Sequence, residues 1–494
     1  MTVLLGLDIG TSGARALAID ADDGSVRSEA TAEYGIQTPR PGWTEQDPGD
    51  WWDAARAVLA EVASDEVAGL GLTGQMHGSV FLDAGDAVIR PALLWNDQRT
   101  AAQCEAITRA VGEKELLAIA GNPALTGFQA PKILWLRDEE PDAYARVRHV
   151  LLPKDYVRLR LTGERATDAS DASGTLLLDV RARDWSGTIL EALEIPREWL
   201  PAVMEGTERA GVLREDVASE LGLPAGLPVA AGGGDNAAAA IGIGVTGHGG
   251  VACSIGTSGV VFAPTGGFVE DPSGRVHAFC HALPGAYHLM AVTLSAGGSL
   301  RWWRDAVAPG EGYDVLQAEA GEVAPGAEGL VFAPYLSGER TPHLDPDARG
   351  GFLGLELRHG RAHMTRAILE GVAFSLRDGL EIMRGLGVAD EDVRAVGGGA
   401  RSAVWRQIVA DVLGRPIRRT VADEGPAYGA ALLAGVASGV YRDAEEATER
   451  VRLRDEVTDP SADAAARYDA LHPLYASLYA RTRGTMHALA AFGR

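Results

Sequence analysis

The chain has 494 residues, 46% of them hydrophobic and 23% charged, a composition typical of a folded globular protein. The net charge of −23 repels phosphate backbones and anionic membranes, which argues against nucleic acid or a membrane as a partner. Three cysteines without a CxxC pair predict a reducing compartment. Because we also find no basic segment before an apolar run and no long apolar stretch, we expect a cytoplasmic protein without a signal peptide or membrane span.

An internal repeat divides the chain. The sequence Ile-Gly-Thr-Ser-Gly at residues 9–13 recurs at residues 255–259, and apolar runs flank both copies. Each copy predicts a β-hairpin whose glycines and backbone N–H groups suit a polyphosphate. The alternative is that this pentapeptide is merely a favoured hairpin turn. Asp8 precedes the first copy and Ser254 the second, so the first copy alone has the carboxylate that a metal site requires.

Apolar periodicity predicts the other elements in chain order. We expect a helix over 50–63, strands over 67–73, 80–82 and 228–231, and a helix over 237–241. Further helices are expected over 364–386, 404–413 and 464–478, with a strand over 394–396. The Gly-rich stretch 242–250 is the expected boundary, which predicts an α/β protein with domains 1–245 and 246–494. None of the three lysines follows a glycine, so the P-loop pattern is absent from the sequence.

Asp235 is the strongest candidate for catalysis. It follows three glycines at the predicted start of a helix, where its carboxylate can cap the first turn. The glycines also let a ligand approach the carboxylate, which favours the hypothesis of a general base. At a helix N-terminus the pKa of such an aspartate is expected to be lowered.

Other candidates are less specific. The Gly-rich turn at 397–402 lacks the last glycine of a dinucleotide fingerprint but suits a phosphate or adenosine, and the turn at 295–299 is a weaker case. His77, in a glycine-flanked tip, is either a ligand contact or a structural histidine. The group His277, Cys280 and His281 lacks a second ligand pair, so we expect no zinc. Residues 335–346 predict a rigid loop, either over a cleft or on the surface.

Seven motifs together make the chain similar to the FGGY family of carbohydrate kinases. They are LDIGTS at 7–12, GWTEQDP at 42–48, GQMHG at 74–78, LWNDQRT at 94–100, LPKDY at 152–156, GGDN at 233–236 and GGGA at 397–400. The resemblance implies two actin-like, ribonuclease H-like domains with a catalytic cleft between them. It also implies transfer of phosphate from ATP to the ketopentose D-xylulose, with Mg²⁺ as cofactor and a possible homodimer.

The same resemblance implies roles for particular residues. Asp235 would be the proton acceptor, Asp8 the second essential carboxylate, and both would hold hydrated Mg²⁺. Met76, His77 and Asn236, together with Asp235, would line the sugar site. The residues implied for ATP are Thr11, Ser12 and Arg15 near the γ-phosphate, and Thr257, Gly298, Gly399 and Ala400 near ADP.

Three alternatives remain open on the sequence. Ribulose, fuculose or gluconate are competing substrates, because the orientation of one hydroxyl depends on unseen side-chain positions. An actin- or chaperone-like ATPase would share the hairpins, but the implied sugar-site residues Met76 and His77 argue against it. A Rossmann oxidoreductase is disfavoured by the incomplete fingerprint.

Overall fold

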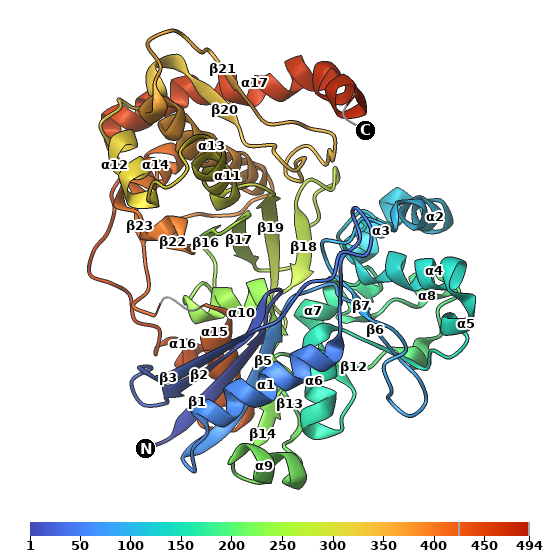
Figure 1. Ribbon diagram of the computed structural model, residues 1–494. Helices are drawn as coiled ribbons and strands as arrows, with labels where there is room; N and C mark the ends of the chain where they lie inside the picture. The colour runs from blue at the N-terminus through green and yellow to red at the C-terminus, as the bar shows by residue number, and fades with distance from the viewer. Residues whose placement is uncertain (423–424, 493–494) are drawn as a thin grey trace.

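Each half of the chain forms one mixed β-sheet (Figure 1). The computed structural model describes residues 1–422 and 425–492. The first sheet has, in spatial order, β13 (Arg209–Val212), β14 (Pro228–Ala230), β5 (Val67–Gly74), β1 (Val3–Ile9), β2 (Gly13–Asp20) and β3 (Val26–Glu33), and β15 (Gly233–Gly234) also pairs with β5. The second has β18 (His277–Cys280), β19 (Tyr287–Thr293), β17 (Gly259–Thr265), β16 (Gly250–Ile255), β22 (Asp392–Val396) and β23 (Ile417–Arg418).

The two pentapeptide repeats are hairpin tips, as the sequence predicts. β1 and β2 are antiparallel up to the pair Ile9–Ala14, and β16 and β17 up to Ile255–Gly259. Their apolar residues are buried, which explains why both runs form central strands. β1 and β16 each also pair with a parallel strand, β5 and β22 respectively. The halves therefore repeat one topology, an α/β arrangement with hairpin, helix and parallel strands.

Helices pack around both sheets and form a separate group beside the first sheet (Figure 1). In the first half they are α1 (Pro48–Val62), α2 (Ala101–Val111), α3 (Glu113–Ala120), α4 (Gln129–Glu139), α5 (Pro141–Tyr144), α6 (Pro153–Thr162), α7 (Ala169–Ser173), α8 (Gly187–Leu193), α9 (Glu215–Leu221) and α10 (Asp235–Gly242). In the second half they are α11 (Gly297–Val307), α12 (Tyr313–Gly321), α13 (Arg361–Gly385), α14 (Ala403–Leu413), α15 (Pro426–Ala437), α16 (Ala444–Thr448) and α17 (Ala462–Phe492).

Short strand pairs complete the fold: β4 (Glu45–Gln46) with β7 (Ala92–Leu93), β6 (Val80–Leu82) with β8 (His149–Leu151), β9 (Ala166–Asp168) with β12 (Ala202–Met204), β10 (Leu178–Asp179) with β11 (Asp184–Trp185), and β20 (Val331–Ala333) with β21 (Gly351–Leu353). The predicted helices match α1, α10, α13 and α14 closely. The expectation of a helix ending at 478 is wrong, because α17 continues to Phe492. Among the described residues, none of the helices combines the length and the apolar character that a membrane span requires.

Helix α15 connects the two halves. Although it comes late in the sequence, it packs on β1 and β5 of the first sheet and against α10. The approach is so close that a Cβ added at Gly6 would lie 1.8 Å from the carbonyl oxygen of Ala427, and one at Gly71 would lie 1.9 Å from that of Ala430. Glycine at these strand positions is therefore a steric requirement. The domain division at residue 245 stays a prediction.

We predict that Gly71→Ala destabilises the protein by about 3 kcal/mol, because the new methyl group must displace the backbone of α15. Gly35→Ala is the matched control, since a Cβ there meets nothing within 4 Å. Urea unfolding of both variants measures the difference. Equal midpoints for the two variants would contradict the steric role of Gly71.

Candidate functional site

Asp235 is the first residue of α10 and lies between the two halves of the protein. The N-cap is Gly234, without a side-chain cap, so Asp235 does not cap the helix. Its Oδ1 instead accepts hydrogen bonds from the backbone N–H of Asn236 at 2.7 Å and from Asn236 Nδ2 at 2.8 Å. Both bonds hold the same oxygen, which orients the carboxylate.

The electrostatic setting of Asp235 differs from the sequence expectation. Burial raises the pKa of Asp235 to about 6, and the two hydrogen bonds from Asn236 counteract only part of this shift. The expected lowering by the helix N-terminus is therefore wrong, because loss of hydration outweighs the helix. The carboxylate is ionised at neutral pH and is a stronger base than an ordinary aspartate.

Asp8 lies at the same edge of the first sheet. In the parallel pairings Asp8 is opposite Thr73, and Thr73 is opposite Gly233. Neighbouring strands are about 4.8 Å apart, so the backbones of Asp8 and Gly233 are separated by roughly 10 Å. Asp235 follows Gly233 by two residues, which brings both carboxylates to the carboxyl ends of parallel strands in one sheet.

Side chains from several segments hold the first hairpin tip. Tyr34 donates its hydroxyl to the Gly10 carbonyl at 2.6 Å, and Gln46 Nε2 donates to the Thr11 carbonyl at 2.7 Å. Trp95 Nε1 donates to the hydroxyl oxygen of Thr11 at 3.0 Å. The Thr11 hydroxyl thereby accepts one bond and keeps its own proton for another acceptor.

Met76 and His77 form the turn beside Gly234. A Cβ at Gly234 would lie 2.9 Å from Cγ of Met76, so the methionine packs directly on the residue before Asp235. His77 has a left-handed backbone, with a φ of 70°, and its Nδ1 lies 2.6 Å from the Gly174 carbonyl, to which it donates. Burial lowers the pKa of His77 to about 3, so the ring is neutral with Nε2 as an acceptor.

The backbone of this turn is held by a buried lysine. Lys132 Nζ donates to the His77 carbonyl at 2.7 Å and to the Gly127 carbonyl at 2.6 Å. The Lys132 side chain is fully buried, and burial lowers its pKa to about 7. His77 is thus fixed both through its ring and through its backbone.

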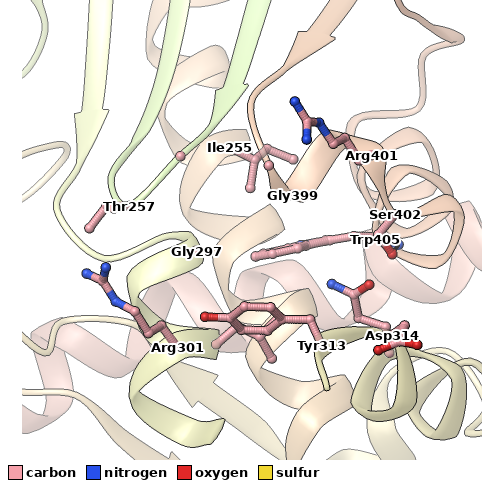
Figure 2. Close-up of a pocket in the computed structure, with 14 residues that line it drawn as sticks. Ile255, Thr257, Gly297, Arg301, Tyr313, Asp314, Gly399, Arg401, Ser402 and Trp405 are labelled. Atoms are coloured by element: carbon pink, nitrogen blue, oxygen red, sulfur yellow. Dashed lines mark hydrogen bonds between the residues drawn. The ribbon is translucent and has the colours of Figure 1, made fainter. Parts of the chain in front are cut away.

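A cavity of about 710 Å³ lies in the second half, between the second hairpin tip, α11, α12 and α14. Figure 2 shows Tyr313 and Trp405 projecting into it from different walls, with Arg301 near Thr257 and Arg401 near Gly399. Its volume falls in the range of small-molecule sites, and its mixed aromatic and cationic lining suits a nucleotide.

A second cavity, of about 230 Å³, contains Asp235. Asn236 and Ser254 also line it, and it meets the larger cavity at one Gly-rich turn: residues 396–397 line the small cavity and residues 398–399 the large one. Strand β16 also borders both cavities, because Ser254 lines the small one and Ile255 lines the large one. The two cavities are therefore neighbours across a wall of glycine-rich backbone.

Of the residues implied for nucleotide binding, Thr257 and Gly399 line the large cavity. Gly298 adjoins it, donating its N–H to the Thr257 carbonyl at 3.0 Å, and Ala400 is buried in the next turn. The first-hairpin residues line neither cavity: these are Asp8, Thr11, Ser12 and Arg15, and Arg15 pairs with Glu29 at 2.5 Å. Met76 and His77 also lie outside both cavities.

Sequence reasoning missed several residues of the site. Tyr313 and Gln317 share one face of α12 at a spacing of four, an ordinary helical pattern that carries no signal for ligand binding. Gln46 and Trp95 belong to two of the seven family motifs. Their contacts with the first hairpin were not predictable, because the segments that contain them are far from the hairpin in the sequence. Among the described residues no group of three His, Cys, Asp or Glu side chains is arranged to hold a metal ion, and the absence of zinc at His277, Cys280 and His281 stays a prediction.

The loop over 335–346 is irregular and packs inward. Glu339 is buried and accepts hydrogen bonds from the Thr293 hydroxyl at 2.6 Å and the Leu294 N–H at 3.0 Å. These bonds attach the loop to the end of β19, immediately before the 295–299 turn. Burial raises the pKa of Glu339 to about 7.

The comparisons with known proteins agree with this geometry. Residues 3–242 match the N-terminal domain of the FGGY family of carbohydrate kinases, and residues 251–438 match its C-terminal domain. The chain is 43% identical to a xylulose kinase of Escherichia coli (strain K12), over 96% of this chain and 98% of that one. It is 40% identical to a xylulose kinase of Lactococcus lactis, over 100% and 99%.

A solved structure of xylulose kinase from Rhodospirillum rubrum superimposes with a TM-score of 0.91 at 32% identity, covering 98% of this chain and 100% of that one. The actin-like pair of domains that the resemblance implied is thereby the fold of this protein. The chain belongs to the FGGY family of carbohydrate kinases and is an ATP-dependent sugar kinase.

Proposed function

We propose that the protein transfers the γ-phosphoryl group of ATP to D-xylulose, giving D-xylulose 5-phosphate and ADP. The observation that supports this most is the Asp235 carboxylate, which lines the small cavity next to the nucleotide-sized one. The near full-length similarity to chains named xylulose kinase supports the choice of sugar. A homodimer and a cytoplasmic location stay predictions.

In this proposal Asp235 is the general base. Its Oδ2 accepts the proton of the sugar hydroxyl while the oxygen attacks the γ-phosphorus, and the bond to the ADP oxygen breaks. Phosphoryl transfer depends more on positioning than on base strength, so a pKa near 6 is sufficient. Met76, His77 and Asn236 would line the sugar, since Met76 packs on Gly234, His77 is the next residue of the same turn, and Asn236 donates to Asp235.

The nucleotide would lie in the large cavity, with its ADP portion near Thr257, Gly298, Gly399 and Ala400. Its phosphates would extend toward the first hairpin, where Thr11, Ser12 and Arg15 stand. Asp8 and Asp235 are suitable ligands for Mg²⁺, which takes one or two carboxylates and otherwise water and phosphate oxygens. When bound, Mg²⁺ would supply charge neutralisation for the triphosphate.

An ADP-release assay with xylulose, ribulose, fuculose, gluconate and glycerol tests the choice of sugar. We expect kcat/KM for D-xylulose to exceed the others by at least about tenfold, because a site that pairs with particular hydroxyls rejects sugars that leave its buried groups unpaired. A higher value for any other acceptor would replace D-xylulose in the proposal.

We predict that Asp235→Asn lowers kcat by about 10³-fold while ATP binding persists, since the substitution removes the proton acceptor and leaves the lining of the large cavity unchanged. In the wild type, kcat/KM should rise with pH through about 6 and then level, because the base must be deprotonated. A solvent-exposed aspartate, with its usual pKa of 3.8, would place this rise near that lower pH. Near-normal turnover of Asp235→Asn would exclude this residue as the base.

Trp95 gives a test of the first hairpin. Its indole N–H fixes the Thr11 hydroxyl, which in the proposal donates to the γ-phosphate. We predict that Trp95→Phe lowers kcat/KM for ATP about tenfold, the equivalent of one neutral hydrogen bond. Trp185→Phe is the control, because it removes a similar bond, to the Pro201 carbonyl at 2.8 Å, away from both cavities. Equal activity in the two variants would contradict a role for the hairpin tip.

A further inference from the structure

A cluster of five charged side chains is buried behind the strand that leads to Asp235. Lys154 Nζ lies 2.7 Å from Asp155 Oδ1, 2.8 Å from Asp168 Oδ1 and 3.1 Å from Asp171 Oδ2, and Arg158 Nη1 lies 2.6 Å from Asp155 Oδ1. All five side chains have no exposed surface. They belong to α6 and to the β9–α7 segment.

Burying such a cluster is an energetically unfavourable way to stabilise a core. Removing charges from water costs several kcal/mol for each ion, and well-packed apolar side chains often serve equally well. Burial raises the pKa of Asp171 well above its usual range, and the neighbouring Asp155 and Asp168 carboxylates raise it further. Stability alone therefore does not explain the cluster, and the backbone segment that it holds in place indicates a further role.

Hydrogen bonds lead from the cluster to the residue before Asp235. Asp168 Oδ2 accepts from the backbone N–H of Ser170 at 2.8 Å and from the Ser170 hydroxyl. Ser170 Oγ in turn accepts from the backbone N–H of Gly234 at 3.1 Å. At the other end of the same segment, Arg158 donates to the Ala231 carbonyl.

The held segment is also fixed by a short strand pairing, by backbone hydrogen bonds from Ala231 and Gly232, and by close packing. β15 consists of Gly233 and Gly234, which have wide backbone freedom, and within the described chain its strand pairing is to β5 alone. Its packing is close, since a Cβ at Gly233 would lie 2.8 Å from the Cβ of Ala282. A small rotation of the Gly234 peptide would swing the Asp235 carboxylate, because α10 begins at that bond.

We propose that Ser170, oriented by Asp168 and Lys154, is a positioning residue for Asp235. Its hydroxyl fixes the Gly234 peptide and so sets where the Asp235 carboxylate meets the sugar hydroxyl. Ser170 touches no reacting atom. The inference rests on the proposed function, in which Asp235 is the base.

The test compares Ser170→Ala with Ser173→Ala. Ser173 is a buried serine of the same helix whose Oγ also accepts a backbone N–H, that of Cys280 at 3.2 Å, but it has no bond to Gly234 in the described structure. We expect Ser170→Ala to lower kcat with D-xylulose at least about tenfold, with KM for ATP within twofold of wild type. Ser173→Ala should keep kcat within about twofold, with a similar change in Tm.

A double-mutant cycle separates positioning from general damage. If Ser170 acts through Asp235, adding Ser170→Ala to Asp235→Asn lowers the residual turnover less than twofold. A further tenfold loss in that background would overturn the inference, as would equal losses in the two serine variants. Wild-type activity on D-xylulose is measured in the same assay, so failure of the proposed function would be seen separately, as absence of sugar-dependent ADP release.

Discussion

The structure depends on backbone segments that approach so closely that only glycine fits between them. Helix α15 reaches the first sheet only because Gly6 and Gly71 have no side chains, and it meets α10 at a similarly close contact, where a Cβ on Gly429 would lie 1.8 Å from the Ala238 carbonyl oxygen. Helix α10 begins at Asp235. The place of the candidate base relative to the second half of the protein is thus set by how closely two helices and a sheet can approach.

The duplicated hairpins have diverged through their surroundings more than through their own residues. Both tips have the same five residues, but the first is held by Trp95, Gln46 and Tyr34, while the second packs on glycines of α11, with Gly297 donating to the Gly256 carbonyl at 2.7 Å. The first therefore presents a fixed Thr11 hydroxyl, three residues after Asp8 in the sequence, and the second opens onto the large cavity. One supersecondary unit serves two purposes because different segments cover it.

Local patterns in the sequence predicted the elements that local forces determine. Apolar periodicity located α1 and α13, and the repeated pentapeptide predicted both hairpins and the two-fold plan. What depends on distant segments was not predictable: the crossing of α15 to the first sheet, the extension of α17, and the cavity wall around Tyr313. The predicted direction of the pKa shift at Asp235 was wrong for the same reason. A helix N-terminus is visible in a sequence, whereas the burial that outweighs it is produced by the whole fold.

The net charge of the chain likewise does not reveal how charges are arranged at the site. A chain of charge −23 would repel a triphosphate at long range, yet the large cavity has Arg301 and Arg401 in its lining. The opposite holds at the other end of the nucleotide path, where Asp8 and Asp235 would stand near the γ-phosphate. Two carboxylates beside a polyanion repel it unless a divalent cation lies between them. In the proposed function these two carboxylates would therefore make turnover depend on a bound metal ion, and would discourage phosphate binding in its absence.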